Sequence, residues 1–352
     1  MNLLDWFRGK AVTIPPLDGA LKPNTRLEEA SIVAELPSPD AVATDGTALY
    51  VSSGNAVLKL DGKGKATPVA EFIAPVTAFA VLPDGAVVVG LDDNRILLKP
   101  AKGGETLLTD IPAPTAFAVE DSVLYVASGS SEHKASEWAR DLMAKGSTGS
   151  VWRVPLSGGK PAKLAGNLAF ANGIAIDATH GRLVVSEAWK HRLVALSKEG
   201  GAPTPVLSNL PGYPSRIAKR PGAGYLLTLF APRNRLIEFV LLEDQYRADM
   251  LRDVPPEFWI APALASNRSF LEPLQCGGVR TMGIHKPWSP SRSYGLVVEL
   301  DEALQPLRSH HSRADGRRHG ITSAIDFGGG IAAASKGGDV VVSIDTGKGA
   351  RA

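Results

Sequence analysis

Short runs of alternating apolar and polar residues recur along the chain, and turns rich in glycine or aspartate separate them. Each repeating unit reads as a strand, a turn, a second apolar strand, another turn and a third strand. Convincing helical periodicity is rare. The unit begins at six positions: Ala41, Ala78, Ala116, Gly173, Arg216 and Ser323.

The spacing of these units indicates a β-propeller. Successive starts lie 37, 38, 57, 43 and 107 residues apart. Three of these spacings are close to the ~40 residues that one four-stranded blade requires. One such sheet cannot bury both of its faces alone, so the units must stack around an axis. We therefore predict an all-β, six-bladed β-propeller that forms one domain over residues 1–352. An open β-sandwich with irregular strands is the alternative.

The two long spacings contain insertions. The first, 130–147 in blade three, includes a predicted helix over Ser136–Lys145. The fifth unit is taken to span Arg216–Val240, and the second insertion, 241–292, follows it between blades five and six. This second insertion is proline-rich and aromatic, and too apolar for a solvated linker. We expect it to fold over the body as a lid, with Trp259 shielding the channel mouth together with Phe270. A dimer interface and a surface for a partner are the alternatives.

The composition is that of an ordinary folded protein. Lys and Arg number 38 against 36 Asp and Glu, which gives a formal charge of +2, and 44% of the residues are hydrophobic. This balance excludes a disordered chain and gives no reason to expect nucleic-acid binding. No apolar stretch approaches the ~18–20 residues of a transmembrane segment. The single cysteine, Cys276, cannot form an internal disulfide, and we expect it to be a small buried side chain.

Residues 1–36 precede the repeats as an N-terminal extension. Met1–Lys10 lacks the features of a secretory signal, because Asp5 interrupts its apolar cluster and no small-residue cleavage site follows. We therefore expect a cytoplasmic protein. The apolar side chains around Trp6 and Phe7 have two readings, packing against the body or contact with a membrane surface.

A polar residue stands at the start of the inner strand of each unit. In a propeller the innermost strands line a central channel, and their starts converge at one mouth. Convergent polar groups on rigid strands are what a small-molecule site needs. The residues at these positions are Asp40, Thr77, Thr115, Asn172, Ser215 and Thr322.

The repeats resemble the strictosidine synthase-like branch of the gluconolactonase and senescence-marker-protein superfamily, whose members are six-bladed propellers. The Asn172-Gly173 pair and the Gly212-Tyr213-Pro214 segment are the more specific similarities. The segments that carry the resemblance are Leu36–Leu60, Thr148–Val154, Phe170–Leu196, Leu210–Arg216, Tyr294–Asp301 and Gly320–Ala324.

The resemblance implies a metal at the channel mouth. Relatives that hydrolyse lactones or phosphate esters hold a divalent cation there, often calcium. Carried over, Asp40 and Asn172 are the metal ligands, with Asp40 in place of the usual glutamate. Ser215 replaces an expected aspartate and Thr115 an expected asparagine, so the set is weak for a cation that prefers several carboxylates. We expect a weakly held calcium ion and no other cofactor. Turn residues that bond nearby backbone are the alternative reading.

The same resemblance argues against strictosidine formation. True strictosidine synthases join an amine to an aldehyde with a glutamate just before the sixth inner strand. In this chain that place falls at 320–322, where there is no carboxylate.

The densest group of chemically active side chains is His310–His319. Histidine suits proton transfer near neutral pH, so His319 is a candidate general base. Arg317 and Arg318 can bind a carboxylate or phosphate, which favours an anionic substrate. A solvated basic loop is the alternative for this stretch.

Further candidates complete the predicted site. Thr115, Ser215 and Thr322 are expected to bind substrate together with the two arginines. Glu187 is a second candidate for acid–base catalysis, and pairing with Lys190 or Arg192 is its structural alternative.

Three functions are compatible with this pattern. The favoured one is a hydrolase of lactone or ester type acting on a small molecule at the channel mouth. The second is a non-catalytic small-molecule-binding or scaffold propeller, which the replacements at Thr115 and Ser215 favour. The third is a membrane-associated accessory protein that uses the N-terminal apolar cluster.

Overall fold

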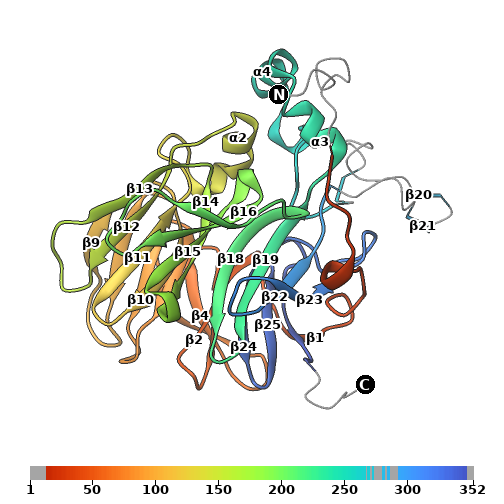
Figure 1. The fold of residues 1–352 in the computed structure, drawn as a ribbon. Coiled ribbons are helices and arrows are strands. Elements are labelled where there is room, and N and C mark those ends of the chain that lie inside the picture. Colours follow the sequence, from red (N-terminus) through yellow and green to blue (C-terminus); the bar gives the residue numbers. More distant parts are fainter. Residues whose placement is uncertain are drawn as a thin grey trace.

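The computed structural model describes residues 13–266, 268–269, 272, 280–281, 284–285 and 292–346. Its main body consists of six four-stranded antiparallel sheets arranged around a central axis (Figure 1). Each sheet is one blade, so the predicted six-bladed β-propeller is confirmed. The inner strands begin within a few residues of the predicted starts of the repeating units.

The first three blades follow one another along the chain without exchange of strands. Blade one consists of β2 (Pro39–Thr44), β3 (Leu49–Ser53), β4 (Ala56–Leu60) and β5 (Ala66–Glu71). Blade two consists of β6 (Val76–Val81), β7 (Val87–Leu91), β8 (Arg95–Lys99) and β9 (Thr106–Asp110). Blade three consists of β10 (Pro114–Glu120), β11 (Val123–Ser128), β12 (Gly149–Pro155) and β13 (Ala162–Leu168).

The remaining blades complete the ring. Blade four consists of β14 (Ala171–Asp177), β15 (Arg182–Glu187), β16 (Arg192–Ser197) and β17 (Thr204–Leu207). Blade five consists of β18 (Gly212–Arg220), β19 (Gly224–Pro232), β22 (Leu296–Leu300) and β23 (Pro306–His311). Blade six consists of β24 (Ile321–Phe327), β25 (Gly330–Ser335), β26 (Val340–Ile344) and β1 (Ser31–Glu35). A separate two-stranded sheet is formed by β20 (Arg280–Thr281) and β21 (Ile284–His285).

The N-terminal strand closes the ring. β1 pairs antiparallel with β26, from Ser31 opposite Ser343 to Glu35 opposite Val340. The segment that the sequence analysis assigned to an extension before the repeats therefore contains the outer strand of blade six. Two stretches that are distant in sequence are held together by this one ladder.

The hydrophobic core consists of six clusters, and each lies between two neighbouring blades. Between blades three and four, for example, Tyr125 and Val151 pack with Ile174 and Val185. Every blade therefore buries both of its faces, which is why its second strand is buried over nearly its whole length instead of at alternate positions. This packing holds the inner strands in fixed positions around the channel.

Both insertions emerge on the face of the ring where the inner strands begin. In an antiparallel blade, the second strand ends where the first begins. Residues 129–148 follow the second strand of blade three, and residues 233–295 follow the second strand of blade five. Figure 1 shows their helices gathered on this face: α2 (Trp138–Met143), α3 (Arg235–Val240) and α4 (Asp244–Asp253). Short 3-10 turns complete the structure: η1 (Gly19–Leu21), η2 (Ala135–Glu137), η3 (Ala178–His180), η4 (Ala188–Lys190) and η5 (Pro256–Phe258).

The helix predicted in the first insertion is confirmed, but two details of blade five are corrected. The second insertion lies inside this blade, between β19 and β22, and not between blades five and six. Arg235–Val240, expected within the fifth strand repeat, is helix α3. The physical reason is a cap: Asn234 Oδ1 accepts a hydrogen bond from Leu236 N–H at 2.9 Å, which stabilises a helix start.

A seventh hydrophobic cluster fastens the helices to the ring. Met143 of α2, Met250 of α4 and the buried Trp259 pack there against Tyr213 and Phe230 of blade five. This part of the second insertion thus folds onto the body, as predicted.

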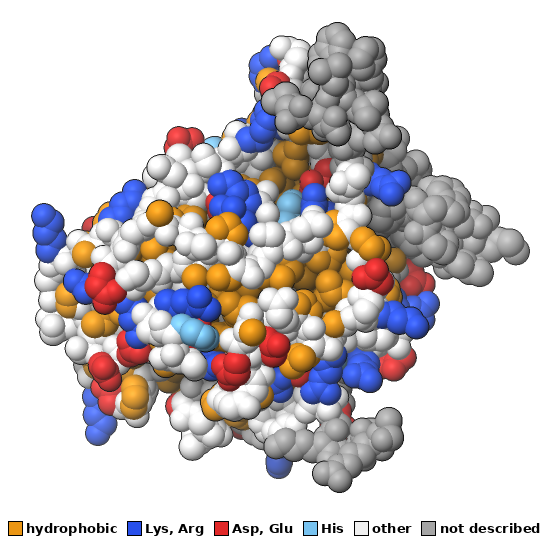
Figure 2. Space-filling model, viewed as in Figure 1, with side chains coloured by type: hydrophobic (Ala, Val, Ile, Leu, Met, Phe, Trp, Pro, Cys, Tyr) orange, Lys and Arg blue, Asp and Glu red, His pale blue; other side chains and the backbone are white. Residues whose placement is uncertain are grey.

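The surface carries mixed charge. Lys and Arg side chains are interspersed with Asp and Glu over the face seen in Figure 2. Among the described residues, no helix is long and apolar enough to cross a membrane. The predictions for Trp6, Phe7 and Cys276 lie outside the described residues.

Candidate functional site

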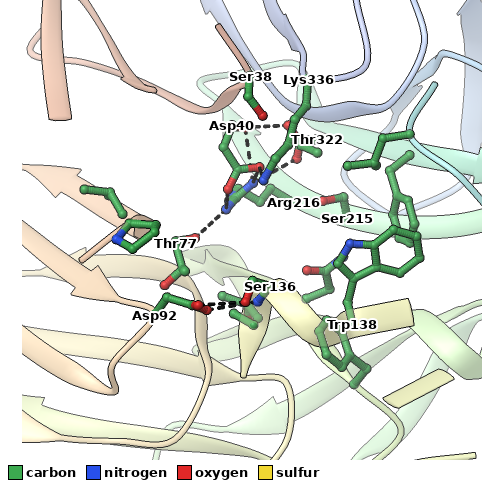
Figure 3. Close-up of a pocket in the computed structure, with 18 of the residues that line it drawn as sticks. Ser38, Asp40, Thr77, Asp92, Ser136, Trp138, Ser215, Arg216, Thr322 and Lys336 are labelled. Atoms are coloured by element: carbon green, nitrogen blue, oxygen red, sulfur yellow. Dashed lines mark hydrogen bonds and ion pairs between the residues drawn. The ribbon is translucent and has the colours of Figure 1, made fainter. Parts of the chain in front are cut away.

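A pocket of about 360 Å³ opens at the mouth where the inner strands begin (Figure 3). All six polar residues predicted at the strand starts contribute to its wall: Asp40, Thr77, Thr115, Asn172, Ser215 and Thr322. Rigid strands from six different blades therefore position one set of polar groups, which is the arrangement that the sequence analysis predicted.

Several of these polar side chains also join neighbouring blades. Thr115 Oγ1 donates to the carbonyl oxygen of Ala171 at 2.6 Å, across the boundary between blades three and four. Asn172 Nδ2 donates to the Pro214 carbonyl at 3.2 Å, which links blade four to blade five. Thr322 Oγ1 donates to the carbonyl of Asp40 at 2.5 Å and so links blade six to blade one. The ring of polar residues thus shapes the pocket and holds its wall together.

An ion cluster formed by Asp40, Arg216 and Lys336 lies at one side of the pocket. Arg216 Nη2 is 3.0 Å from Asp40 Oδ2, and Lys336 Nζ is 3.3 Å from Asp40 Oδ1. Burial alone would raise the pKa of Asp40, but the two neighbouring cations outweigh it and hold the pKa well below its usual range. Asp40 is therefore a fixed negative charge and a poor proton acceptor.

The remaining wall combines one further carboxylate with an apolar surface. Asp92, from the turn after β7, accepts hydrogen bonds from the backbone N–H of Ser136 at 2.9 Å and from its Oγ at 2.7 Å. Figure 3 shows this pair across Thr77 from the ion cluster. The apolar surface is formed mainly by Val76, Trp138, Phe170, Phe230 and Leu264. The pocket accordingly suits a compact ligand with a polar head and an apolar body.

Arg216 also marks the inner end of the pocket. A second cavity of about 530 Å³ lies along the inner strands, with apolar residues such as Val42, Phe79 and Ile174 in its wall. Among the described residues, Arg216 alone contributes to the walls of both cavities. Arg216 therefore lies where the pocket at the mouth and the inner cavity come closest along the chain's described residues.

The two predicted catalytic residues lie outside the pocket wall. His319 is buried, with Nδ1 2.7 Å from Ser293 Oγ and Nε2 2.7 Å from the Arg313 carbonyl, so both ring nitrogens have partners. Glu187 is fully buried and pairs with Lys190 at 2.8 Å and Arg192 at 2.5 Å. These are the ion pairs that the alternative, structural role of Glu187 predicts.

The predicted anion-binding arginines also lie elsewhere. The backbone N–H groups of Arg317 and Arg318 donate to the carboxylate of Glu28, at 2.9 and 3.1 Å. Neither arginine contributes to the pocket wall. The neighbouring His310 and His311 belong to strand β23 and are fully buried, so only part of this stretch is a solvated loop.

The predicted calcium ligands are close to the expected place, but the contacts of Asp40 do not fit a calcium ion. Asp40 is already neutralised by Arg216 and Lys336. The side-chain N–H of Asn172 donates to the Pro214 carbonyl, which leaves its amide oxygen, the atom that a cation would bind, available. A hard cation would bring two more positive charges to a carboxylate that already holds two cations. Among the described residues, no group of three or more His, Cys, Asp or Glu could hold a metal.

The positions of Trp259 and Leu264 show how the second insertion relates to the predicted lid. Trp259 is packed in the helix cluster and does not line the pocket, whereas Leu264 of the same insertion does. The insertion therefore contributes to the mouth through a residue other than the predicted one. Phe270 lies outside the described residues.

Sequence reasoning missed Arg216, Lys336, Asp92 and Ser136. The sequence contains a signal that could have identified Asp92 and Lys336. The turn after the second strand of a blade lies at the same mouth as the start of the first, and Asp92 and Lys336 occupy this turn in blades two and six. Arg216 directly follows the predicted Ser215, but nothing in its strand pattern indicates that it points into the channel.

Fold and site together define a six-bladed β-propeller with a ligand-sized pocket at one mouth of its channel. Residues 116–197 match the strictosidine synthase family model, which confirms the resemblance over blades three and four. A search of curated protein sequences finds no match.

Two solved structures share the fold over most of both chains. One is a gluconolactonase from Xanthomonas campestris, with a TM-score of 0.56 and 14% identity, covering 89% of this chain and 87% of that one. The other is a structural-genomics target provisionally assigned as a gluconolactonase, with a TM-score of 0.56 and 12% identity, covering 91% and 92%. At these identities the likeness shows the fold alone.

Proposed function

We propose that the protein hydrolyses a lactone or ester bond of a small molecule bound in the central pocket. The observation that carries this proposal is the facing of Asp92 and the Arg216–Lys336 pair across one partly apolar cavity. A carboxylate on one side and fixed cations on the other are what water attack on a carbonyl requires. The gluconolactonase-like fold supports the same class of reaction.

In this mechanism Asp92 is the general base. Ser136 donates one hydrogen bond to each of its oxygens, which fixes the carboxylate and leaves further lone pairs for a water molecule. The water oxygen forms a bond to the carbonyl carbon while its proton passes to Asp92. Lys336 and Arg216 stabilise the oxyanion that develops. The ring C–O bond then breaks, and the proton passes from Asp92 to the leaving alkoxide.

Binding without turnover is the second candidate function. Both carboxylates in the pocket wall already have partners, Asp40 with two cations and Asp92 with Ser136. Such an arrangement also suits a receptor site that recognises a ligand and leaves it unchanged.

A panel of five- and six-membered lactones and aryl esters separates the two functions. We expect hydrolysis of at least one lactone or ester class by the wild type, a loss of about 10²-fold or more in kcat for Asp92→Asn, and unchanged turnover for the matched control Asp93→Asn. Asp93 is the next residue, is partly exposed, and pairs only locally with Arg95 at 2.6 Å. Thermal shift on the same panel reports binding. If a ligand raises the melting temperature and no compound of the panel is hydrolysed, the result supports binding without turnover and contradicts the hydrolase function.

A further inference from the structure

The guanidinium group of Arg216 lies where oxygen atoms from several blades converge. It extends from blade five and reaches the carboxylate of Asp40 in blade one, at 3.0 and 3.3 Å. It also donates to three main-chain carbonyls, those of Thr77 at 2.6 Å, Asp40 at 3.2 Å and Thr322 at 3.4 Å. Blades one, two, five and six therefore meet at this one positive group.

A carboxylate together with converging carbonyl oxygens is the kind of donor set that proteins use for hard cations. Here the donors surround a side chain. The side chain of Arg216 is only 14% exposed and that of Asp40 13%, so the pair is largely removed from water. Lys336 adds a second positive charge beside the same carboxylate. The positive charge at this place is therefore carried by the guanidinium group of Arg216.

We propose that Arg216 takes the place of a metal ion at the channel mouth, so that the pocket is assembled and charged without a divalent cation. The guanidinium neutralises Asp40, joins four blades through its hydrogen bonds and presents a permanent positive charge to the ligand. This assignment applies equally to a pocket that hydrolyses its ligand and to one that only binds it.

The direct test is to remove the guanidinium group of Arg216 and to add Ca²⁺. Arg216→Met keeps most of the side-chain length but removes the guanidinium, and Lys336→Gln in the same chain removes the second charge. We expect this double variant to bind Ca²⁺ with a Kd of about 1 mM or tighter, measured by calorimetry, and its melting temperature to rise with CaCl₂ at constant ionic strength. Wild-type protein and the control Arg252→Met, which removes an exposed arginine, should show neither effect.

Two outcomes would overturn the proposal. One is Ca²⁺ binding by the metal-stripped wild type that Asp40→Asn abolishes, because Arg216 would then coexist with a metal. The other is a folded double variant that gains no affinity for Ca²⁺. If the variant does not fold in plain buffer, refolding in the presence of Ca²⁺ or methylguanidinium is the same test. Recovery supports the assignment, and failure with both cations contradicts it.

Discussion

Two buried carboxylates of this propeller are held by cations in similar ways but occupy different surroundings. Asp40 pairs with Arg216 and Lys336 in the wall of the pocket. Glu299, on the third strand of blade five, pairs with Arg220, with Arg308 at 2.5 Å and with His310 at 2.7 Å. Glu299 contributes to neither of the two cavities described above.

The comparison shows that a paired, buried carboxylate is not by itself a sign of function. Glu299 has two cationic partners, as Asp40 has, and a hydrogen bond from His310 in addition. In both groups these partners lower the pKa although burial raises it. What distinguishes Asp40 is the space beside it, which a ligand can enter. The cluster around Glu299 fastens strands β18, β22 and β23 of blade five, and Arg220 extends it to Asp326 of blade six. The cluster around Asp40 also joins different blades, but it lies at an open mouth.

The largest effect on stability is expected at Glu299. Glu299→Ala leaves Arg220, Arg308 and His310 without their shared carboxylate, so the free energy of unfolding should fall by about 3–5 kcal/mol. Denaturant unfolding followed by circular dichroism measures this loss. Ligand binding in the pocket should stay at its wild-type level at temperatures where the variant is folded. A weakened affinity in the folded variant would mean that the two clusters are coupled.

The second largest effect is the loss of stability at low pH. Burial would raise the pKa of Glu299, but hydrogen bonds from His310, Arg308 and Arg220 outweigh it and lower the pKa to about 2. A carboxyl whose pKa is lower in the folded state stabilises the fold above its unfolded pKa of 4.5, and this contribution disappears as the pH falls towards 2. It amounts to about 3 kcal/mol.

Unfolding free energies measured across this acid range should therefore fall steeply for the wild type. Glu299→Gln should show a shallower dependence over the same range, because it has no carboxyl to protonate at this position. Equal slopes in the two proteins would assign the acid sensitivity to other groups.

The smallest effect on stability, but a specific one on ligands, is expected at Lys336. Its side chain is 31% exposed, so Lys336→Met should change the free energy of unfolding by no more than about 0.5 kcal/mol. Affinity for an anionic or carbonyl-bearing ligand should nevertheless fall about ten-fold.

The matched control is Arg308→Met, the more exposed cation of the Glu299 cluster, at 44%. It removes the same charge without touching the pocket, so ligand affinity should not change. Titrations of both variants with a ligand from the lactone panel make the comparison. Equal losses in the two variants would show that Lys336 acts only through the overall charge of the protein.

The sequence was sufficient to predict the ring of polar residues but not their charge partners. The starts of the inner strands follow from the repeat, because all six blades share one geometry. The partners of Asp40 do not follow from the repeat, since Arg216 lies 176 positions away along the chain and on another blade. Lys336 and Asp92 could have been found by noting that antiparallel strands bring the turn after the second strand to the same mouth.

The surroundings of His319 could not be predicted from the sequence. Its residue type is right for proton transfer, but the pattern of the stretch does not reveal that Ser293 and the Arg313 carbonyl engage both ring nitrogens inside the fold. Likewise, the short apolar pattern of Arg235–Val240 suits a strand or a helix, and the cap from Asn234 decides between them. In both places contacts outside the local pattern determine the outcome.

The position of Arg216 in the walls of both cavities has a consequence for the exchange of ligands. We expect its ion pair with Asp40 to restrict passage from the pocket into the inner cavity. Exchange of the ligand would then take place through the mouth. If the pocket hydrolyses its ligand, a product that keeps the polar head of the substrate would compete with it for the same opening.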